Sequence, residues 1–599
     1  MAHPISDSSW RESSQPLLPA SIIPQTPNID IYNHLPSHSL GNGKIFEGYA
    51  SLISWISEQK AVVIDGYVGV FFDVIQEQIN LLMAAQGVEV NWHLSSDYLL
   101  PEEELEELVK PYLGSDDDVW GTKTDLNLND FFNQELTEIT RSSTSAIDII
   151  IGLGAALCGW DAPVVYFDIP KNEIQYRMRA GSATNIGTSR VASNSRGYKR
   201  FYFVDWVVAD RHRNGLCSQI TIMADGQRQR DLTWTFKESL LAGLATMAES
   251  VFRVRPWFEK GSWGGQWMKK HIGGLDTEEV NYAWSFELIT PENGLIFESD
   301  NHLLEVSFDF LMLYQYEAVL GKHAKLFGPY FPIRFDFLDT FDGGNLSVQV
   351  HPSKEYIRDN FGEAITQDET YYILDCEKDA KVYLGFQEDI NPEEFRKALE
   401  DSQTNNQTIE IERYVQALPA HKHDLFLIPN GTVHSSGVNN MVLEISATPY
   451  IFTFKMYDWL SLDLNGNPRP INIGHAFNNL RFERKGDVVQ REHIAHPLSI
   501  AVGEDWELIH LPTHRDHFYD VHRLEFNTSI AVDTEDSCHV LMLVEGDYIA
   551  LEIEGKPAGT IAYAETFVIP AATRHYRLVN MGRTIAKVIK AFIKEETKL

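Results

Sequence analysis

The sequence predicts a multidomain protein of mixed class, in which a parallel α/β domain is followed by two β-barrels. Three observations lead to this prediction. A buried-type strand at 61–66 runs through a glycine turn into an amphipathic helix, as in α/β domains. Short strand-like runs separated by Gly, Pro and Asn fill the chain from about residue 256 onward. The length of 599 residues allows three or four domains, since a domain usually holds roughly 100–200 residues.

The chain divides into four predicted parts. Residues 1–43 are rich in Ser and Pro and lack the charged-then-apolar order of a signal peptide, so we expect an irregular N-terminal arm. Residues 44–250 form the α/β domain, 256–485 the first barrel and 486–599 the second. A helical insertion is expected near 387–420, where Asn-Pro gives a start signal and EEFRKAL has apolar residues at helical spacing.

Composition excludes several classes of function. The formal net charge is 50 − 85 = −35, which argues against general nucleic-acid affinity. No stretch approaches the roughly 20 apolar residues of a membrane span, so we expect no membrane partner. The four cysteines form no CxxC pair and are expected to be reduced, buried thiols of a cytoplasmic protein.

The elements of the α/β domain follow from apolar runs. Residues 61–66, 148–157 and 162–170 have the composition of buried parallel strands, and we interpret 201–210 as a further strand. The segment 74–87, VIQEQINLLMAAQG, has the periodicity of an amphipathic helix.

The glycine turn after the first strand has the context of a phosphate-binding loop. Its end departs from the pattern, because Phe71, Phe72 and Asp73 stand where Gly, Lys and Ser or Thr are needed. Lysine neutralises the terminal phosphates and the hydroxyl binds magnesium, and these residues do neither. The segment 167–184 resembles the strand and Arg-bearing lid of uridine-kinase-like P-loop kinases. We favour a degenerate kinase-like scaffold over a functional kinase or an unrelated α/β domain.

Four arginines of this domain are candidates for holding an anion. Solvated surface arginine is nevertheless the default expectation for each of them. They are Arg177, Arg179, Arg211 and Arg213.

Four residues further along the chain point to a metal site. Gln349 and His351 are two apart in an alternating strand, so they share one face. Glu369 opens a second strand-like run, and His434 follows a turn at PNGT. Two imidazoles, a carboxylate and an amide oxygen form a plausible shell for zinc or a harder divalent ion, with room for water or substrate as in a catalytic site. Each residue taken singly is more often a hydrogen-bonded core residue, but the combined pattern favours the metal.

These motifs carry a resemblance to a known family. HDLFLIPNGTVH has the form of the cupin strand-turn-strand element, in which Gly431 allows the turn. From about Pro256 to Phe592 the chain resembles type I mannose-6-phosphate isomerase. The matching segments are 262–274, 331–356 and 448–480.

The resemblance implies the fold and the cofactor of the C-terminal half. It implies two cupin (jelly-roll) barrels, the first with one Zn²⁺ per chain on Gln349, His351, Glu369 and His434, and the second without metal. Together with the preceding domain, the fold class is a P-loop-like parallel α/β domain followed by two cupin barrels with a small helical insertion. A second metal site would need other histidines, whose spacing is poor and which lack a carboxylate in register. They are His514, His517, His522 and His575.

The resemblance also implies the reaction and its residues. The family interconverts mannose 6-phosphate and fructose 6-phosphate through an enediol. Ser347 is retained, Lys455 replaces an arginine, and Gln367 stands where the family often has lysine. A family lysine is replaced by Asp336, with Arg334 two positions earlier. A family glutamate is replaced by Tyr282, with Glu287 nearby.

The candidate catalytic residues are therefore Lys455, Arg334, Ser347 and Glu287, with Lys354 as a further cation. Two interpretations remain open: a divergent isomerase of a phosphorylated hexose, and a non-catalytic metal-holding sugar-binding or regulatory protein. A different cupin isomerase or epimerase, or a bifunctional kinase–isomerase, are further alternatives. A homo-oligomer is possible, with the N-terminal domain pairing subunits or packing on the barrels.

Overall fold

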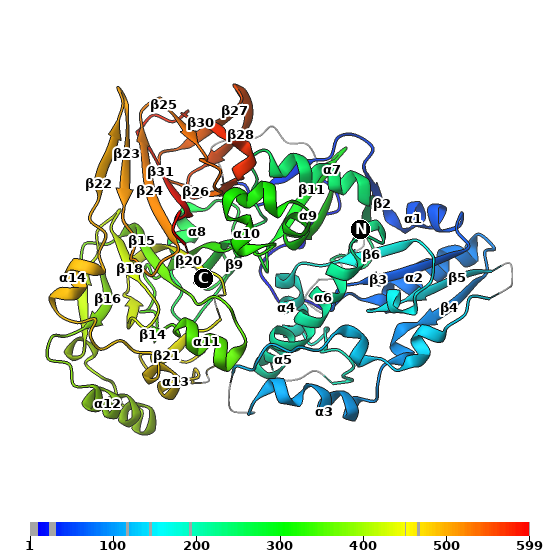
Figure 1. The fold of residues 1–599 in the computed structure, drawn as a ribbon, viewed down its shortest axis with the longest axis horizontal. Coiled ribbons are helices and arrows are strands. Elements are labelled where there is room, and N and C mark those ends of the chain that lie inside the picture. Colours follow the sequence, from blue (N-terminus) through cyan, green and yellow to red (C-terminus); the bar gives the residue numbers. More distant parts are fainter. Residues whose placement is uncertain are drawn as a thin grey trace. The chain divides into compact units, whose positions relative to one another are not determined.

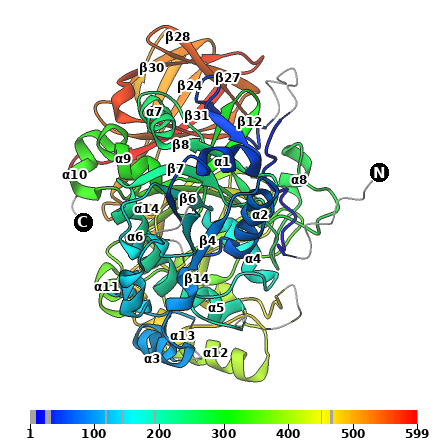
Figure 2. The same cartoon turned by 90° about the vertical axis from the view of Figure 1, so that its right-hand side faces the viewer.

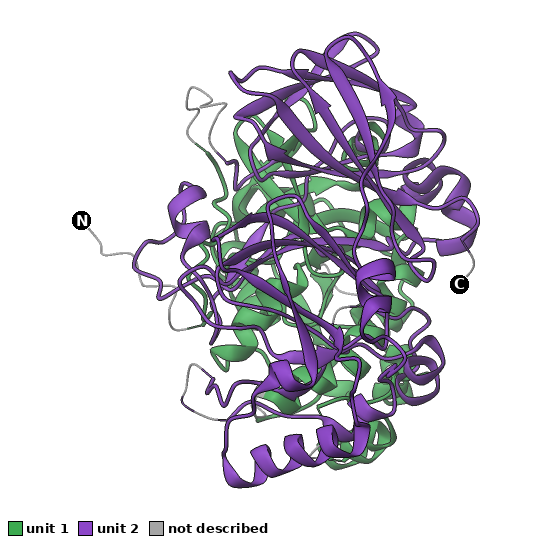
Figure 3. Cartoon of the chain, turned by 90° about the vertical axis from the view of Figure 1, so that its left-hand side faces the viewer, with its two compact units in different colours: residues 1–26, 37–246, 291–314 green, residues 27–36, 247–290, 315–599 purple. Residues whose placement is uncertain are grey.

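The computed structural model describes residues 10–22, 32–115, 119–142, 146–190, 194–449, 451–463, 466 and 468–597. The chain forms two compact units, which Figure 3 distinguishes by colour. The mixed α/β class with many β-sheets is confirmed. Unit 1 holds residues 1–26, 37–246 and 291–314, and unit 2 holds 27–36, 247–290 and 315–599.

A seven-stranded sheet forms the centre of unit 1 (Figure 1). Strands β3 to β7 are parallel, and β8 runs antiparallel to β7 at one side. The central strands β3, β5 and β6 are buried along their whole length, as expected for parallel strands covered on both faces. In spatial order the strands are β2 (Ile45–Glu47), β8 (Thr233–Phe236), β7 (Ile220–Asp225), β6 (Val164–Asp168), β3 (Ala61–Gly66), β5 (Ile147–Ile151) and β4 (Val90–Leu94).

Seven helices accompany this sheet within the described residues, and α1 and α2 pack side by side (Figure 2). The helix predicted at 74–87 is confirmed as α2, with Ile75, Ile79 and Met83 on its buried face. The seven helices are α1 (Gly48–Ile56), α2 (Phe72–Ala85), α3 (Glu102–Leu113), α4 (Lys171–Arg179), α5 (Asn194–Arg200), α6 (Trp206–Leu216) and α7 (Lys237–Ala248).

The strand predicted at 201–210 is wrong. Phe201–Asp205 is a π-helical turn and Trp206 begins α6. Phe201, Phe203 and Val204 are all buried. A helical segment that is apolar on all sides has the same composition as a buried strand, and periodicity alone does not separate the two.

Two of the four arginines that were candidates for anion binding are buried, which corrects the expectation that all four are solvated at the surface. Arg177 is 0% exposed, lies 4.1 Å above the Phe71 ring and donates to the carbonyl of Gly69 at 2.6 Å. Arg213 is 2% exposed and pairs with Asp210 and Asp309 at 3.0 and 2.7 Å. Buried arginines require such partners, because an unpaired charge is costly away from water. Arg179 is partly buried and Arg211 is exposed.

The N-terminal arm contacts the helix that carries Arg177. The Arg11 guanidinium pairs with Glu173 at 2.9 Å, with both side chains buried, and the Trp10 ring meets Phe71 edge-on at 5.8 Å. Residues 37–39 form β1, which pairs in parallel with β11. Residues 1–9 and 23–31 of the predicted arm lie outside the described residues.

A small sheet of unit 1 contains β1 (Ser37–Ser39), β11 (Gly294–Ser299) and β12 (His302–Ser307), after which α9 (Asp309–Leu320) begins.

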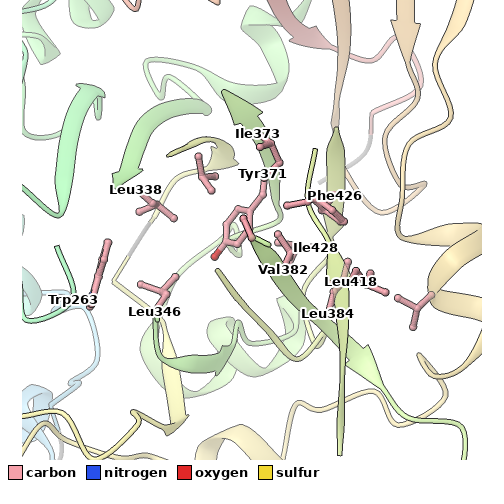
Figure 4. Close-up of a cluster of buried hydrophobic side chains, with 14 of the residues drawn as sticks. Trp263, Leu338, Leu346, Tyr371, Ile373, Val382, Leu384, Leu418, Phe426 and Ile428 are labelled. Atoms are coloured by element: carbon pink, nitrogen blue, oxygen red, sulfur yellow. The ribbon is translucent and has the colours of Figure 1, made fainter. Parts of the chain in front are cut away.

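Two sheets of unit 2 enclose a first apolar core, which Figure 4 shows. Leu338, Tyr371 and Ile373 come from one sheet, and Val382 and Leu384 from the other. One sheet holds β18 (Leu425–Ile428), β15 (Glu369–Cys376), β20 (Asn440–Ala447), β13 (Ile333–Asp339), β10 (Trp284–Leu288) and β9 (Trp257–Glu259); the other holds β17 (Val415–Pro419), β16 (Lys381–Phe386), β19 (His434–Ser436), β14 (Val348–Val350) and β21 (Phe454–Tyr457).

The helix expected near 387–420 is α12 (Pro392–Asn405). The Asn391 side chain accepts hydrogen bonds from the backbone N–H groups of Glu393 and Glu394, which satisfies two of the unpaired donors that every helix start leaves. The other helices of unit 2 are short: α8 (Trp267–His271), α10 (Ala324–Phe327), α11 (Lys354–Phe361), α13 (Ile473–Phe477) and α14 (Asp487–Glu492).

A second pair of sheets encloses its own core near the C-terminus. Leu541, Leu551 and Val588 are all 0% exposed within it. The two β-rich regions are consistent with cupin-like domains. The sheets are β22 (Leu498–Val502), β23 (Trp506–Leu511), β24 (Tyr519–Phe526), β31 (Ala586–Ile593), β26 (His539–Glu545) and β29 (Thr566–Ile569), and β25 (Ser529–Asp533), β30 (His575–Asn580), β27 (Tyr548–Ile553) and β28 (Lys556–Ala562).

Within the described part of the chain, no helix has the length and apolar character needed to cross a bilayer.

The second core gives a stability prediction. Leu541→Ala removes buried methyl groups and leaves a cavity, so we expect the free energy of opening of β24, β26 and β31 to fall by about 2–5 kcal/mol. Hydrogen exchange followed by mass spectrometry on the full chain measures this change. Met581→Ala is the matched control, because Met581 is 48% exposed, and its effect should stay within about 0.5 kcal/mol. Equal protection in both variants would contradict the assignment of Leu541 to this core.

Candidate metal centre

Three ligand-type side chains converge inside the first pair of sheets of unit 2. His351 follows β14, Glu369 opens β15 and His434 opens β19. The His351 Nε2 lies 3.2 Å from one Glu369 carboxylate oxygen, and the His434 Nε2 lies 2.8 Å from the other. All three are buried, with ligand atoms within 4.8 Å of one another. Of the residues that the structure describes, no other group of three His, Cys, Asp or Glu meets this condition.

Backbone carbonyls orient both imidazoles. The His351 Nδ1 lies 3.1 Å from the carbonyl oxygen of Phe452, and the His434 Nδ1 lies 2.9 Å from that of Thr432. A proton on each Nδ1 satisfies these acceptors and leaves the Nε2 lone pair for a metal ion. Gly431 makes the turn before His434 with φ at 82°, a conformation that favours glycine.

Gln349 lies beside the triad as the sequence predicts. It is the register partner of His434 across β14 and β19, and its side-chain nitrogen is 3.2 Å from His434 Nε2. The Ser347 hydroxyl donates to the Gln349 amide oxygen at 2.8 Å. If the amide is turned by 180°, its oxygen faces the triad and its NH₂ group faces Ser347. The Ser347 hydroxyl can accept a hydrogen bond from this NH₂ group as well as it donates to the oxygen. Ser347 therefore holds the Gln349 amide beside the triad.

The donor set fits a divalent metal. Within the described residues, His351 Nε2 and Glu369 Oε1 are buried and make no hydrogen bond of acceptable geometry. Burial raises the pKa of Glu369, but His351 and His434 outweigh it and hold that pKa well below its usual range. An anionic carboxylate with two imidazoles and an amide oxygen matches zinc and similar ions. A bound cation would satisfy the orphaned atoms, whose burial is otherwise costly.

An acidic network surrounds the predicted catalytic residue Arg334. Its Nε lies 3.1 Å from Asp336, and a second nitrogen pairs with Glu444. Gln367 donates to Glu369 at 2.8 Å and to Glu444 at 3.1 Å. Burial raises the pKa of Asp336 to about 7 although Arg334 lowers it. The Arg334 guanidinium therefore forms ion pairs with two carboxyl groups of the protein itself.

Strand register explains why these groups meet. Across three neighbouring strands, Glu369 lies opposite Ser446, which lies opposite Arg334. Side chains in such a row share one face of the sheet. Glu444 occupies the adjacent row, and sequence reasoning missed it. Its signal is the alternation with Ser446, two residues later on the same strand.

Lys455 is the second predicted cation. It is the register partner of Gln349 on β21, so its side chain lies on the face that carries the ligands. Burial and Arg469 lower the pKa of Lys455 to about 8, against an opposing effect of Asp458. Among the described residues, no ion pair of Lys455 is found within 4.0 Å.

Glu287, another predicted catalytic residue, makes hydrogen bonds with residues outside the triad. It accepts a hydrogen bond from the Tyr32 hydroxyl at 2.6 Å and another from Ser285. Burial raises its pKa although these hydrogen bonds lower it. The structure thus brings Gln349, Ser347 and Lys455 to the triad and ties Glu287 to the segment at Tyr32.

Two parts of the chain are similar to different known families. Residues 48–249 match a family described as "Domain of unknown function (DUF8485)". Mannose-6-phosphate isomerase ManA of Bacillus subtilis (strain 168) is 27% identical over 219 residues, which are 37% of this chain and 64% of that protein. Mannose-6-phosphate isomerase of Streptococcus mutans serotype c is 27% identical over 239 residues, 39% of this chain and 68% of that protein.

The alignment with ManA spans slightly less than two thirds of that relative. The crystal structure of the Bacillus subtilis mannose 6-phosphate isomerase covers 57% of this chain and 99% of its own length, with a TM-score of 0.46 and 18% identity. The C-terminal part of the chain is isomerase-like in sequence.

We predict about one divalent ion per chain in protein purified without added metal. The variant His351→Ala/His434→Ala removes two imidazoles and should lose the ion, as measured by elemental analysis. His510→Ala/His522→Ala is the control, because it removes two histidines from strands β23 and β24, and it should keep the ion. Stoichiometric metal in the first variant would rule out this centre.

Proposed function

We propose that the C-terminal part of this chain is a zinc-dependent aldose–ketose isomerase that interconverts mannose 6-phosphate and fructose 6-phosphate. The observation that carries the proposal is the buried triad of His351, Glu369 and His434, with Gln349 beside it. Sequence similarity to mannose-6-phosphate isomerases supports the choice of reaction. We propose Zn²⁺ as the ion and a cupin fold for both barrels.

The reaction moves a proton between C1 and C2 through an enediol. It needs a base for a weakly acidic C–H and positive charge for the oxygens that become anionic. A bound divalent ion would supply Lewis-acid stabilisation of that charge. Lys455 adds a cation on the ligand-bearing face, and its lowered pKa lets it exchange a proton close to neutral pH.

Anion binding is the point at which the chain differs from what the resemblance implies. Asp336 and Glu444 neutralise Arg334, and Gln367 carries no charge. Recognition of a sugar phosphate then rests on Lys455, with Lys354 at the start of α11 as a further cation. This same neutralisation favours the second candidate function, a metal-holding protein that binds a sugar or sugar phosphate without turnover.

For residues 44–250 we propose a P-loop-derived scaffold that transfers no phosphate. Two backbone N–H groups of the glycine turn are already bound, Val70 to the Tyr67 carbonyl and Phe72 to that of Val70. A Cβ at Gly66 would lie 3.2 Å from the Phe72 ring, so that ring fills the turn. Arg177 covers Phe71 from the other side. These contacts occupy the space where a phosphate would meet free N–H groups.

Lys455→Met should lower kcat/KM on the true hexose phosphate at least tenfold, or about 1.4 kcal/mol, because it removes a cation from the ligand-bearing face. Steady-state kinetics with added zinc measures the effect. Lys397→Met on the exposed side of α12 is the matched control and should leave the rate unchanged. Equal rates in both variants would exclude Lys455 from the site. Micromolar binding of a hexose phosphate without turnover by the wild type would favour the binding protein.

Calorimetry of the full chain with Mg-ATP should show weak or no binding, since the turn lacks a lysine and is filled by Phe72. Slow hydrogen exchange in the buried strands β3, β5 and β6 of the same preparation shows that unit 1 is folded. Micromolar binding together with ATP-dependent phosphorylation of a nucleoside or sugar would refute the scaffold proposal and favour a bifunctional kinase–isomerase.

A further inference from the structure

Unit 1 contains a cavity of about 300 Å³ that lies outside the filled glycine turn. Its apolar walls come from Leu128, Leu157 and Leu216. Its polar lining comes from Asn127, Asn129, Arg211, His212 and Gln219. Five of its ten lining residues have polar side chains, so the cavity combines the size of a small-ligand site with a markedly polar lining.

Asp65 is fixed behind one wall of this cavity. It lies near the carboxyl end of β3, is 0% exposed and accepts from the N–H groups of Gly66, Gly154 and Ala156 at 2.7, 3.0 and 2.9 Å. Its second oxygen lies 2.8 Å from His212 Nε2. Three backbone donors hold the carboxylate in one orientation, so that it sets the orientation of the imidazole in turn.

His212 has one ring nitrogen left for a ligand. Nε2 donates to Asp65, and within the described residues Nδ1 makes no hydrogen bond. Burial lowers the pKa of His212, but the Asp65 carboxylate outweighs it and raises that pKa above its ordinary value. A protonated imidazole offers an N–H at Nδ1 with a positive charge. The side chain lines the cavity while only 8% of it is exposed.

The charge of the lining selects the class of ligand. The chain carries a formal net charge of −35, yet the described residues that line this cavity include no Asp or Glu. Its polar groups are three amides, one guanidinium and one imidazole. Amide and cationic N–H groups recognise oxyanions, and a carboxylate is the usual partner that fixes a histidine in such a role.

We propose that this cavity binds a small metabolite bearing an oxyanion, a phosphate monoester or a carboxylate, with His212 Nδ1 donating to the oxyanion and Asp65 holding the imidazole in place. The two residues are 147 positions apart in sequence, and the fold brings them together where strands of the parallel sheet end. In open α/β sheets, ligands bind at the carboxyl ends of the strands. The proposal does not depend on the isomerase activity.

Calorimetry of the full chain with inorganic phosphate, glycerol phosphate and succinate tests the proposal. We expect at least one probe to bind with a dissociation constant below about 1 mM, that is, more favourably than about −4 kcal/mol. His212→Gln should weaken this binding at least tenfold. Binding of the phosphates alone assigns a phosphate ester, and binding of succinate alone assigns a carboxylate. Failure of all three probes to bind with a dissociation constant below about 1 mM, that is, more favourably than about −4 kcal/mol, would overturn the proposal.

Two further variants keep the test sharp. His510→Gln is the matched control, because His510 also lies 2.9 Å from a carboxylate, that of Asp520, in the C-terminal β-rich region; binding should be unchanged. If His212→Gln fails to fold, Gln219→Leu replaces an exposed lining amide and should weaken binding measurably.

Hydrogen exchange locates the site, with ligand-dependent protection expected in peptides covering 124–131, 152–158 and 206–219. Unchanged binding in both lining variants, or protection elsewhere, would also overturn the proposal.

Discussion

The burial of the Glu369 carboxylate is the constraint on which the first pair of sheets of unit 2 depends. An ionised carboxylate inside a protein is stable only where opposite charge and hydrogen-bond donors surround it. Gln367 donates a hydrogen bond to it, and the Nε2 atoms of His351 and His434 lie 3.2 and 2.8 Å from its two oxygens, where a shared cation would compensate its charge. The strands that present them must hold their register, because a slip of one residue would turn every ligand to the opposite face. The apolar core beyond the ligands fixes that register, since Tyr371 and Ile373 follow Glu369 on the same face of β15.

Charge compensation around this carboxylate shapes what the centre can bind. Arg334 lies between Asp336 and Glu444, so its positive charge stabilises the protein and is not free for a ligand. Removing either partner would leave an uncompensated charge in a buried place. Lys455 is placed differently, opposite Gln349 and without a close carboxylate among the described residues. It is a compact, flexible cation, and it does not provide the planar, bidentate fork of arginine. Lys455 therefore offers an anionic group a charge with less directional hydrogen bonding than an arginine would give.

Unit 1 shows how a loop with a phosphate-binding context is closed by its own side chains. Phe72 fills the turn at Gly66, and Arg177 spans from the Phe71 ring to the Gly69 carbonyl. Trp10 of the arm adds an edge-on contact to Phe71. Asp65, which precedes this turn in sequence, instead contacts His212, a lining residue of the cavity. The side chains of this domain thus fill the glycine turn and line a separate cavity at His212.

The sequence alone determined the features that depend on local spacing. Gln349 and His351 are two apart on a strand, the PNGT turn precedes His434, and α2 follows a glycine turn, so periodicity and turn chemistry were sufficient to predict that helix and to select these side chains as candidate metal ligands. Tertiary structure decided the features that depend on register and burial. Glu444 reaches Arg334 across 110 residues, and His212 reaches Asp65 across 147, which no local pattern encodes. The segment at 201–210 is a helix for a similar reason: its apolar residues suit a buried strand and a buried helix equally, and only the packing around them decides between the two.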